Sequence, residues 1–161
     1  MNQINPQLTL AVTAFLNLEA DMLDNKEYHD WLELWNDDGF YIVPVDHDVT
    51  DYSAAVNVAY DDKEMRELRV ARLTSGDAVS TVGAEKTVRT VSGVRVLSED
   101  NNLIAARYKY CLFENNKNGI RQFPATVEVK LSPLGDTFKI VEKVVKVMKS
   151  AQHLTTINYL F

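Results

Sequence analysis

The stretch LDNKEYHDWLELWNDDGFYIVPV, residues 23–45, contains the change from helix to strand on which the fold depends. A short helix is predicted over roughly residues 27–35, because the large apolar side chains there fall on one helical face. These side chains are Tyr28, Trp31, Leu32 and Trp35. The turn formers at 36–39 predict a turn, and the β-rich run at 40–45 predicts a strand that closes at Pro44.

Carboxylates surround this apolar face and are candidates for acid/base chemistry: Asp24, Glu27, Asp30, Glu33, Asp37 and Asp38. Once they are placed on the predicted helix and turn, most of them lie away from the apolar face. We interpret them as solvated surface groups, some of which meet arginines of a partner. Trp31, Leu32 and Trp35 are predicted to be core residues that fix the short helix onto the rest of the domain.

Two further helices flank this stretch. Asn5 offers a side-chain acceptor at an N-cap and Pro6 suits the first helical position, so a helix is predicted from there to about Leu23. Its apolar residues recur at steps of three and four: Leu8, Ala11, Val12, Phe15, Leu18, Met22 and Leu23. Residues 46–60 are polar and without a clear period, which predicts a loop. Residues 61–76 predict a third helix, acidic at its start and arginine-rich towards its end, as the helix dipole favours.

The rest of the chain is strand-like. Residues 123–131 carry the clearest period-2 signal, because apolar residues alternate there with polar ones. Strands are also predicted over 88–97, 103–114 and 138–148, and the sequence ENNKNG at 114–119 predicts a hairpin loop.

This order of elements predicts an α+β fold in a single domain that spans residues 1–161. A curved, mixed or antiparallel sheet wrapped around the N-terminal helices would form a cone with an open mouth. Such a cone either binds a small molecule or is filled by its own side chains.

The composition excludes several classes of partner. The chain has 161 residues, of which 46% are hydrophobic and 25% charged, and 17 basic against 23 acidic side chains give a net charge of −6. No cluster of Lys and Arg breaks this balance, so neither a nucleic acid nor an anionic membrane is expected as a partner. No secretory signal is visible, and a single cysteine cannot form an internal disulfide, so a cytoplasmic location is predicted.

The residues that hold metals in proteins are scattered. His29, His47 and His153 are far apart, and none of them stands in a Cys-x-His, His-x-x-x-His or Cys-x-x-Cys arrangement. No Gly-x-Gly-x-x-Gly, Walker or Gly-x-Ser-x-Gly motif occurs. The sequence therefore predicts no metal, cofactor or nucleophilic site in this chain.

One enzymatic alternative stays open at this point. His29 or His47, with a nearby aspartate and a tyrosine such as Tyr28 or Tyr60, could form an acid/base pocket inside the cone. The chain would then be a free-standing dehydratase or isomerase that needs no cofactor. Cys111 lies in the middle of a predicted strand, where we interpret it as a buried structural thiol.

Three segments together resemble a known family. They are DMLDNKEYHDWLELWNDDGFYIVP at 21–44, AYDDKEMRELRVARLTSG at 59–76 and FKIVEKVVKVMKSAQHLTTINYLF at 138–161. Their order, spacing and residue types are similar to those of the small (β) subunit of the aromatic-ring-hydroxylating dioxygenases, over nearly the whole chain.

The resemblance implies a cone-like domain of the type found in nuclear transport factor 2, also described as cystatin-like. It implies a mainly structural, non-catalytic subunit of an oxidoreductase that degrades aromatic compounds. A homotrimer would support three large (α) subunits in a heterohexamer. The Rieske 2Fe–2S cluster and the mononuclear iron would lie in the large subunit, with no cofactor in this chain.

Such a subunit needs surfaces for itself and for its partner, and arginine and aromatic residues are enriched in interfaces. The candidate interface residues are Arg66, Arg69, Arg72, Arg89, Arg95, Tyr159 and Phe161. In the alternative interpretation, the arginines pair with acids of their own chain and the C-terminal residues complete the sheet.

Overall fold

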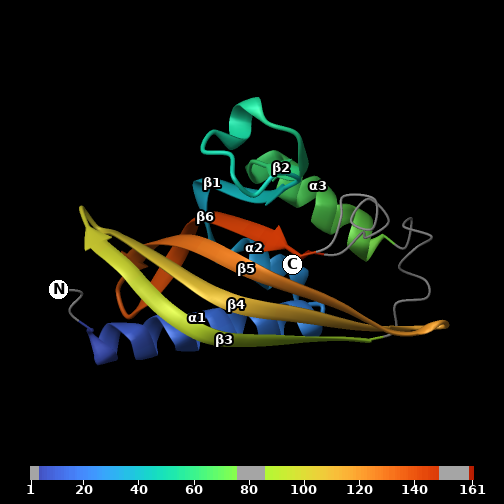
Figure 1. Ribbon diagram of the computed structural model, residues 1–161, viewed down its shortest axis with the longest axis horizontal. Helices are drawn as coiled ribbons and strands as arrows, with labels where there is room; N and C mark the ends of the chain where they lie inside the picture. Colours follow the sequence, from blue (N-terminus) through green and yellow to red (C-terminus); the bar gives the residue numbers. More distant parts are fainter. Residues whose placement is uncertain (1–3, 76–85, 149–159) are drawn as a thin grey trace.

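The computed structural model of the protein describes residues 4–75, 86–148 and 160–161 (Figure 1). Its elements, in chain order, are α1 (Pro6–Asp24), α2 (Tyr28–Leu32), β1 (Trp35–Pro44), the 3-10 turn η1 (Tyr52–Ala54), β2 (Asn57–Asp61), α3 (Lys63–Thr74), β3 (Lys86–Asp100), β4 (Leu103–Asn116), β5 (Gly119–Leu134) and β6 (Thr137–Val147).

The strands form one six-stranded sheet in the order β2-β1-β6-β5-β4-β3. β1 pairs with β6 in parallel, and the other neighbours are antiparallel. In Figure 1 the long strands β3, β4 and β5 run side by side, with α1 along β3 and with α3 beside β1 and β2 at the other end of the sheet. The predicted α+β fold, a curved mixed sheet with N-terminal helices, is confirmed.

The first helix begins and packs as its sequence predicts. The Asn5 Oδ1 atom accepts a hydrogen bond from the Leu8 amide at 3.1 Å, and Pro6 occupies the first turn, where its missing N–H costs nothing. The face turned towards the sheet buries Val12, Phe15, Leu16, Glu19, Ala20 and Leu23. One member of this apolar face, Glu19, is therefore a carboxylate.

Residues 36–39, predicted to be a turn, belong instead to β1. Trp35 lies opposite Ile140 and Phe40 lies opposite Glu142, so five steps along β1 match only two along β6. Residues 36–39, which were expected to form a separate turn, are therefore the extra residues of a bulge within β1. At Gly39 an added Cβ would lie 2.9 Å from the Ile140 carbonyl oxygen, so the bend has room for glycine alone.

The loop predicted over 46–60 is also partly wrong, because residues 57–61 form β2. This strand pairs with β1, with Tyr41 opposite Asp61 and Val43 opposite Ala59. Its five residues are too few to show a period, and the pairing with β1 decides their conformation.

The core lies between the helices and the sheet. The alternation predicted over 123–131 is confirmed, since its odd-numbered residues are all buried: Phe123, Ala125, Val127, Val129 and Leu131. The predicted hairpin loop is a two-residue turn between Asn116 and Gly119.

Around the opening stretch, three aromatic rings meet edge to face. Trp31 lies 5.5 Å from Trp35 and 6.3 Å from Tyr41, measured between ring centroids. Trp31 and Trp35 are 0% and 4% exposed, whereas Leu32 is half-buried against the same core. Edge-to-face pairs of this kind contribute about 0.5–1.5 kcal/mol beyond area burial.

Candidate functional site

A buried ion pair lies inside the cone, between α1 and β6. The Lys143 Nζ atom is 2.9 Å from the Glu19 Oε1 atom, and neither residue is more than 3% exposed. Trp31 donates its Nε1–H to the Glu19 Oε2 atom at 3.0 Å. Lys143 also donates to the main-chain oxygen of Phe161 at 2.7 Å. The carboxylate and the ammonium group are thus held both by each other and by neutral partners.

The charges of this pair are maintained by their contacts. Burial lowers the pKa of Lys143, and the Glu19 carboxylate opposes that shift because it favours the ammonium form. Taking two charges out of water costs several kcal/mol per ion, and close geometry with extra hydrogen bonds offsets that cost. The arrangement fixes α1 to β6 and leaves Glu19 without the freedom of a general base.

A second ion pair joins the end of α1 to β3. The Arg89 Nη1 atom lies 2.7 Å from the Asp24 Oδ1 atom, and the Arg89 amide donates to Asp24 Oδ2 at 2.9 Å. Thr87 donates its hydroxyl to the same carboxylate at 3.0 Å. The Arg89 Nε atom donates to the Tyr110 hydroxyl at 2.8 Å, and Nη2 donates to the Leu160 carbonyl. Asp24, one of the candidates for acid/base chemistry, therefore anchors the first helix to the sheet.

Buried phenols complete the inside of the cone. Tyr41 accepts a hydrogen bond on Oη from the Phe161 amide at 2.9 Å, and burial raises the pKa of Tyr41 to about 12. Burial likewise raises the pKa values of Tyr108 and Tyr110. At neutral pH these three side chains are therefore protonated phenols rather than bases, and Tyr110 accepts the Arg89 hydrogen bond described above.

The structure places several predicted interface residues inside the chain. Arg66 is 1% exposed, and its guanidinium donates to the carbonyls of Gly39, Asp61 and Asn36. The same group stacks 4.3 Å from the Trp35 ring centroid, and burial lowers the pKa of Arg66. A surface position was expected for Arg66. Instead its guanidinium is buried, and main-chain carbonyls of β1 and β2 accept its hydrogen bonds.

The other predicted interface residues divide in the same way. Arg89 and Phe161 are 8% and 2% exposed, so both lie inside rather than at a surface. Arg69 is half-buried and bidentate to Asp61, at 2.6 and 3.0 Å. Arg72 and Arg95 are exposed, on α3 and β3 respectively. Tyr159 lies outside the described residues.

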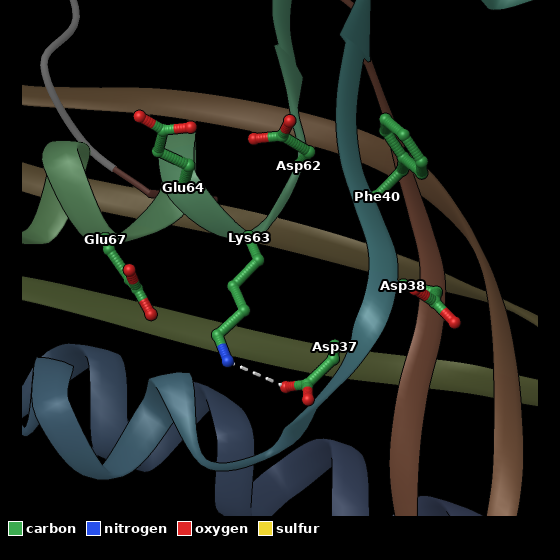
Figure 2. A pocket seen from close by; sticks show the side chains of 7 residues that line it. All are labelled: Asp37, Asp38, Phe40, Asp62, Lys63, Glu64 and Glu67. Carbon is green, nitrogen blue, oxygen red and sulfur yellow. Dashed lines mark hydrogen bonds and ion pairs between the residues drawn. The ribbon is translucent and has the colours of Figure 1, made fainter.

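The acids of the opening stretch are at the surface, as predicted: Glu27, Asp30, Glu33, Asp37 and Asp38 are all exposed. Two of them line an open cleft of about 450 Å³ with residues of α3 and its N-cap. Figure 2 shows the side chains around this acidic cleft, which is lined by Asp37, Asp38, Phe40, Asp62, Lys63, Glu64 and Glu67. Lys63 reaches Asp37 at 3.0 Å. In the sequence, Asp37 and Asp38 belong to a predicted turn, and Asp62 and Glu64 belong to the start of a predicted helix. Neither pattern indicates that these carboxylates lie around one cleft.

The proposed acid/base pocket of histidines does not assemble. His29 is exposed on α2, and His47 is half-buried in the segment after β1. His153 lies outside the described residues. Tyr60 is 39% exposed on β2.

Within the part of the chain that the structure describes, no three His, Cys, Asp or Glu side chains gather so as to hold a metal ion. Those residues therefore do not fit a Rieske cluster or a mononuclear iron. Cys111 is half-buried rather than buried, and burial raises the pKa of its thiol. Across the same residues, none of the helices combines the length and apolar character needed to cross a bilayer.

The interior ion pair was missed by reasoning from the sequence, although each of its members carries a signal. Glu19 follows Phe15 by four residues and precedes Leu23 by four, which puts a carboxylate in the apolar stripe of α1. Lys143 takes an inward position in β6, among Phe138, Ile140, Val145 and Val147. Two opposite charges at core positions of two elements indicate a buried pair.

Comparison with known proteins gives a consistent result. Residues 18–152 match the family profile described as ring hydroxylating beta subunit. The anthranilate 1,2-dioxygenase small subunit of Acinetobacter baylyi is 27% identical over 139 residues, which is 83% of this chain and 85% of that protein. The toluate 1,2-dioxygenase subunit beta of Pseudomonas putida is 25% identical over 138 residues, again 83% of this chain and 85% of that protein.

A solved structure shows the same fold. The beta subunit of the benzoate 1,2-dioxygenase of Burkholderia mallei superposes with a TM-score of 0.78 at 22% identity, over 99% of this chain and 100% of that one. The relatives are thus small subunits of dioxygenases that act on aromatic compounds. Because the family profile covers most of its length, the chain belongs to the family of ring-hydroxylating beta subunits.

Proposed function

We propose that this chain is the small, mainly structural subunit of a multicomponent aromatic-ring-hydroxylating dioxygenase. The observation that carries the proposal is the family match over residues 18–152. The oxidation then belongs to the assembly, an oxidoreductase, and the chain contributes to it by supporting a large oxygenase subunit. Nothing in the comparisons favours a free-standing dehydratase or isomerase.

The large subunit would carry the Rieske cluster and the catalytic iron. Two features of this chain support such a division of labour. The described residues offer no ligand set for either group. In addition, Glu19, Lys143, Asp24 and Arg89 are engaged with their own chain inside the cone.

The names of the relatives support a proposal for the substrate class. Anthranilate, toluate and benzoate, for which the three reported dioxygenases are named, are all aromatic rings that carry a carboxylate. We therefore propose an aromatic carboxylate as the substrate of the assembly, with the ring bound by the large subunit.

For the assembly itself we propose one domain over residues 1–161, a homotrimer of this chain, and a heterohexamer with three large subunits in the cytoplasm. Arg72 and Arg95 are exposed and available to a partner, and Arg69 is partly so. They remain the candidates for these contacts, as does Tyr159, which lies outside the described residues, because planar guanidinium groups and large rings give much contact per ordered side chain.

Light scattering after size-exclusion chromatography tests this proposal, first on the chain alone and then on the chain co-expressed with its large subunit. We expect the mass of three chains and then of a hexamer, and ring oxidation of benzoate, anthranilate or toluate only by the complex with its electron donor. Arg72→Glu and Arg95→Glu should weaken assembly, whereas Lys117→Glu, in the exposed β4–β5 turn, is the matched charge reversal and should not. A monomer that ignores the large subunit and converts a small substrate alone would contradict the proposal.

A further inference from the structure

The inside of the cone holds two residues that come from far along the chain. Leu160 and Phe161 are 1% and 2% exposed. The Phe161 ring packs edge to face on Phe123, with 6.1 Å between the centroids and an angle of 75° between the planes. The two residues thus fill space enclosed by the sheet.

Polar side chains form hydrogen bonds with the main chain of these two residues. Lys143 donates to the Phe161 oxygen at 2.7 Å, and Tyr41 accepts from the Phe161 amide at 2.9 Å. Arg89 donates to the Leu160 carbonyl. These groups come from β1, β3 and β6, and Phe123 comes from β5. A strand ladder would use backbone partners, whereas here side chains of four strands converge on one phenyl ring and on the main-chain N–H and oxygens beside it.

Both cations of the site already have carboxylate partners, apart from the main-chain oxygens of Leu160 and Phe161. Lys143 pairs with Glu19, and Arg89 pairs with Asp24. The donors that point to residues 160–161 are therefore additional hydrogen-bonding capacity on two buried cations. Such donors cost about 1–3 kcal/mol each when they are left without an acceptor. This combination of an apolar ring slot with convergent polar groups is typical of small-molecule sites.

We propose that the inside of the cone is a binding site for a small aromatic compound with a carbonyl-type oxygen on a short chain, and that Leu160–Phe161 is its built-in occupant. Phe123 receives the ring, and Lys143 and Arg89 receive the oxygen. In the native chain the occupant is covalently attached, so its effective concentration is high and a free ligand does not compete. This inference goes beyond the proposed function, because binding needs neither the large subunit nor turnover.

The first test deletes residues 160 and 161 and adds 3-phenylpropanamide, which has the carbon skeleton of a phenylalanine residue without its amino group. n-Propylbenzene offers the same ring without the oxygen. We expect the amide to bind the deletion variant saturably and to raise its thermal midpoint by about 3–5 °C at roughly ten times the dissociation constant. Propylbenzene should bind at least about tenfold more weakly, and the native chain should bind neither compound.

A second variant keeps the proposal testable if the deletion does not fold. Phe161→Ala retains the main-chain oxygens and removes only the ring, so it should bind toluene and show no preference for the amide. Leu134→Ala, which trims a side chain that is 52% exposed, is the matched control and should bind neither compound.

Three results would overturn the proposal. The first is a folded variant of either kind that binds no arene. The second is a deletion variant that binds propylbenzene as tightly as the amide, since the site would then be an apolar cavity without oxygen recognition. The third is a native chain that binds the amide as tightly as the deletion variant does.

Discussion

The inside of the cone and the acidic cleft both gather charged side chains, and they differ in how those charges are satisfied. Inside, the side chains of Glu19 and Lys143 are 3% and 1% exposed and form one close pair. In the cleft, the Lys63 and Asp37 side chains are 52% and 81% exposed, and further carboxylates surround them. Glu19 and Lys143 thus neutralise each other inside the cone, whereas the cleft accumulates mainly negative charge.

The difference follows from the solvent. Water screens the carboxylates of the cleft, so their mutual repulsion is small and their ion pair contributes little. No such screening acts on Glu19 or Lys143, and the loss of one partner leaves a buried charge unpaired. The interior should therefore respond strongly to single substitutions, and the cleft weakly.

The largest effect is expected for Lys143→Met, which leaves the Glu19 carboxylate buried with Trp31 as its remaining donor. We expect a loss of about 3–5 kcal/mol in the free energy of unfolding, measured with urea. The double variant Glu19→Gln/Lys143→Met removes both charges and should recover at least about half of that loss. A double variant no more stable than the single one would show that packing, rather than the unpaired charge, sets the cost.

Alkaline pH should lower the free energy of unfolding through Tyr41, which lies beside the same ion pair. The pKa of Tyr41 in the folded state is raised to about 12, so the unfolded chain loses this proton at lower pH than the native chain does. The stabilisation from this phenol is complete below about pH 10 and is lost as the pH rises towards 12. Tyr41→Phe should reduce the decline in unfolding free energy over that range by about 2 kcal/mol relative to the native chain. Equal declines in the two proteins would contradict this.

Trp31→Phe separates packing from hydrogen bonding beside the ion pair. Phenylalanine keeps an aromatic ring against Trp35 and Tyr41 but offers no donor to Glu19. We expect a loss of about 2 kcal/mol, because a buried carboxylate oxygen then lacks a partner. In a Glu19→Gln background, Trp31→Phe should cost less unfolding free energy than it does in the native chain. A coupling free energy near zero between the two substitutions would contradict the role of this hydrogen bond.

The smallest effects belong to the cleft. Asp62→Ala should cost about 1 kcal/mol, because Asp62 Oδ1 accepts the Met65 amide at 3.0 Å and caps α3. Asp38→Asn and Glu64→Gln change the same surface charge without removing a cap, and each should stay within about 0.5 kcal/mol of the native protein. Thermal unfolding at low and high salt measures all three variants. A loss above about 2 kcal/mol for Asp38→Asn would contradict the comparison.

Periodicity predicted the elements that one face of a helix or strand defines. The apolar stripe of α1 and the alternation of β5 are local, so they could be seen in the sequence. β2 and the irregular start of β1 depend on pairing with distant strands, and that pairing has no local signal. The same holds for Arg66, which was predicted to be an interface residue although its donors meet carbonyls of β1 and β2.

The order of strands also matters while the chain is being made. β1 pairs with β6, and Trp35 lies opposite Ile140. This pairing cannot form until the ribosome has added Ile140, more than a hundred residues after Trp35. At about 5–20 residues per second, that interval lasts roughly 5–20 s. Until it ends, one edge of the newly made β1–β2 ribbon is open to strands of other chains. Synonymous codons that slow translation of residues 62–136 should therefore lower the yield of soluble protein even though the finished sequence is unchanged.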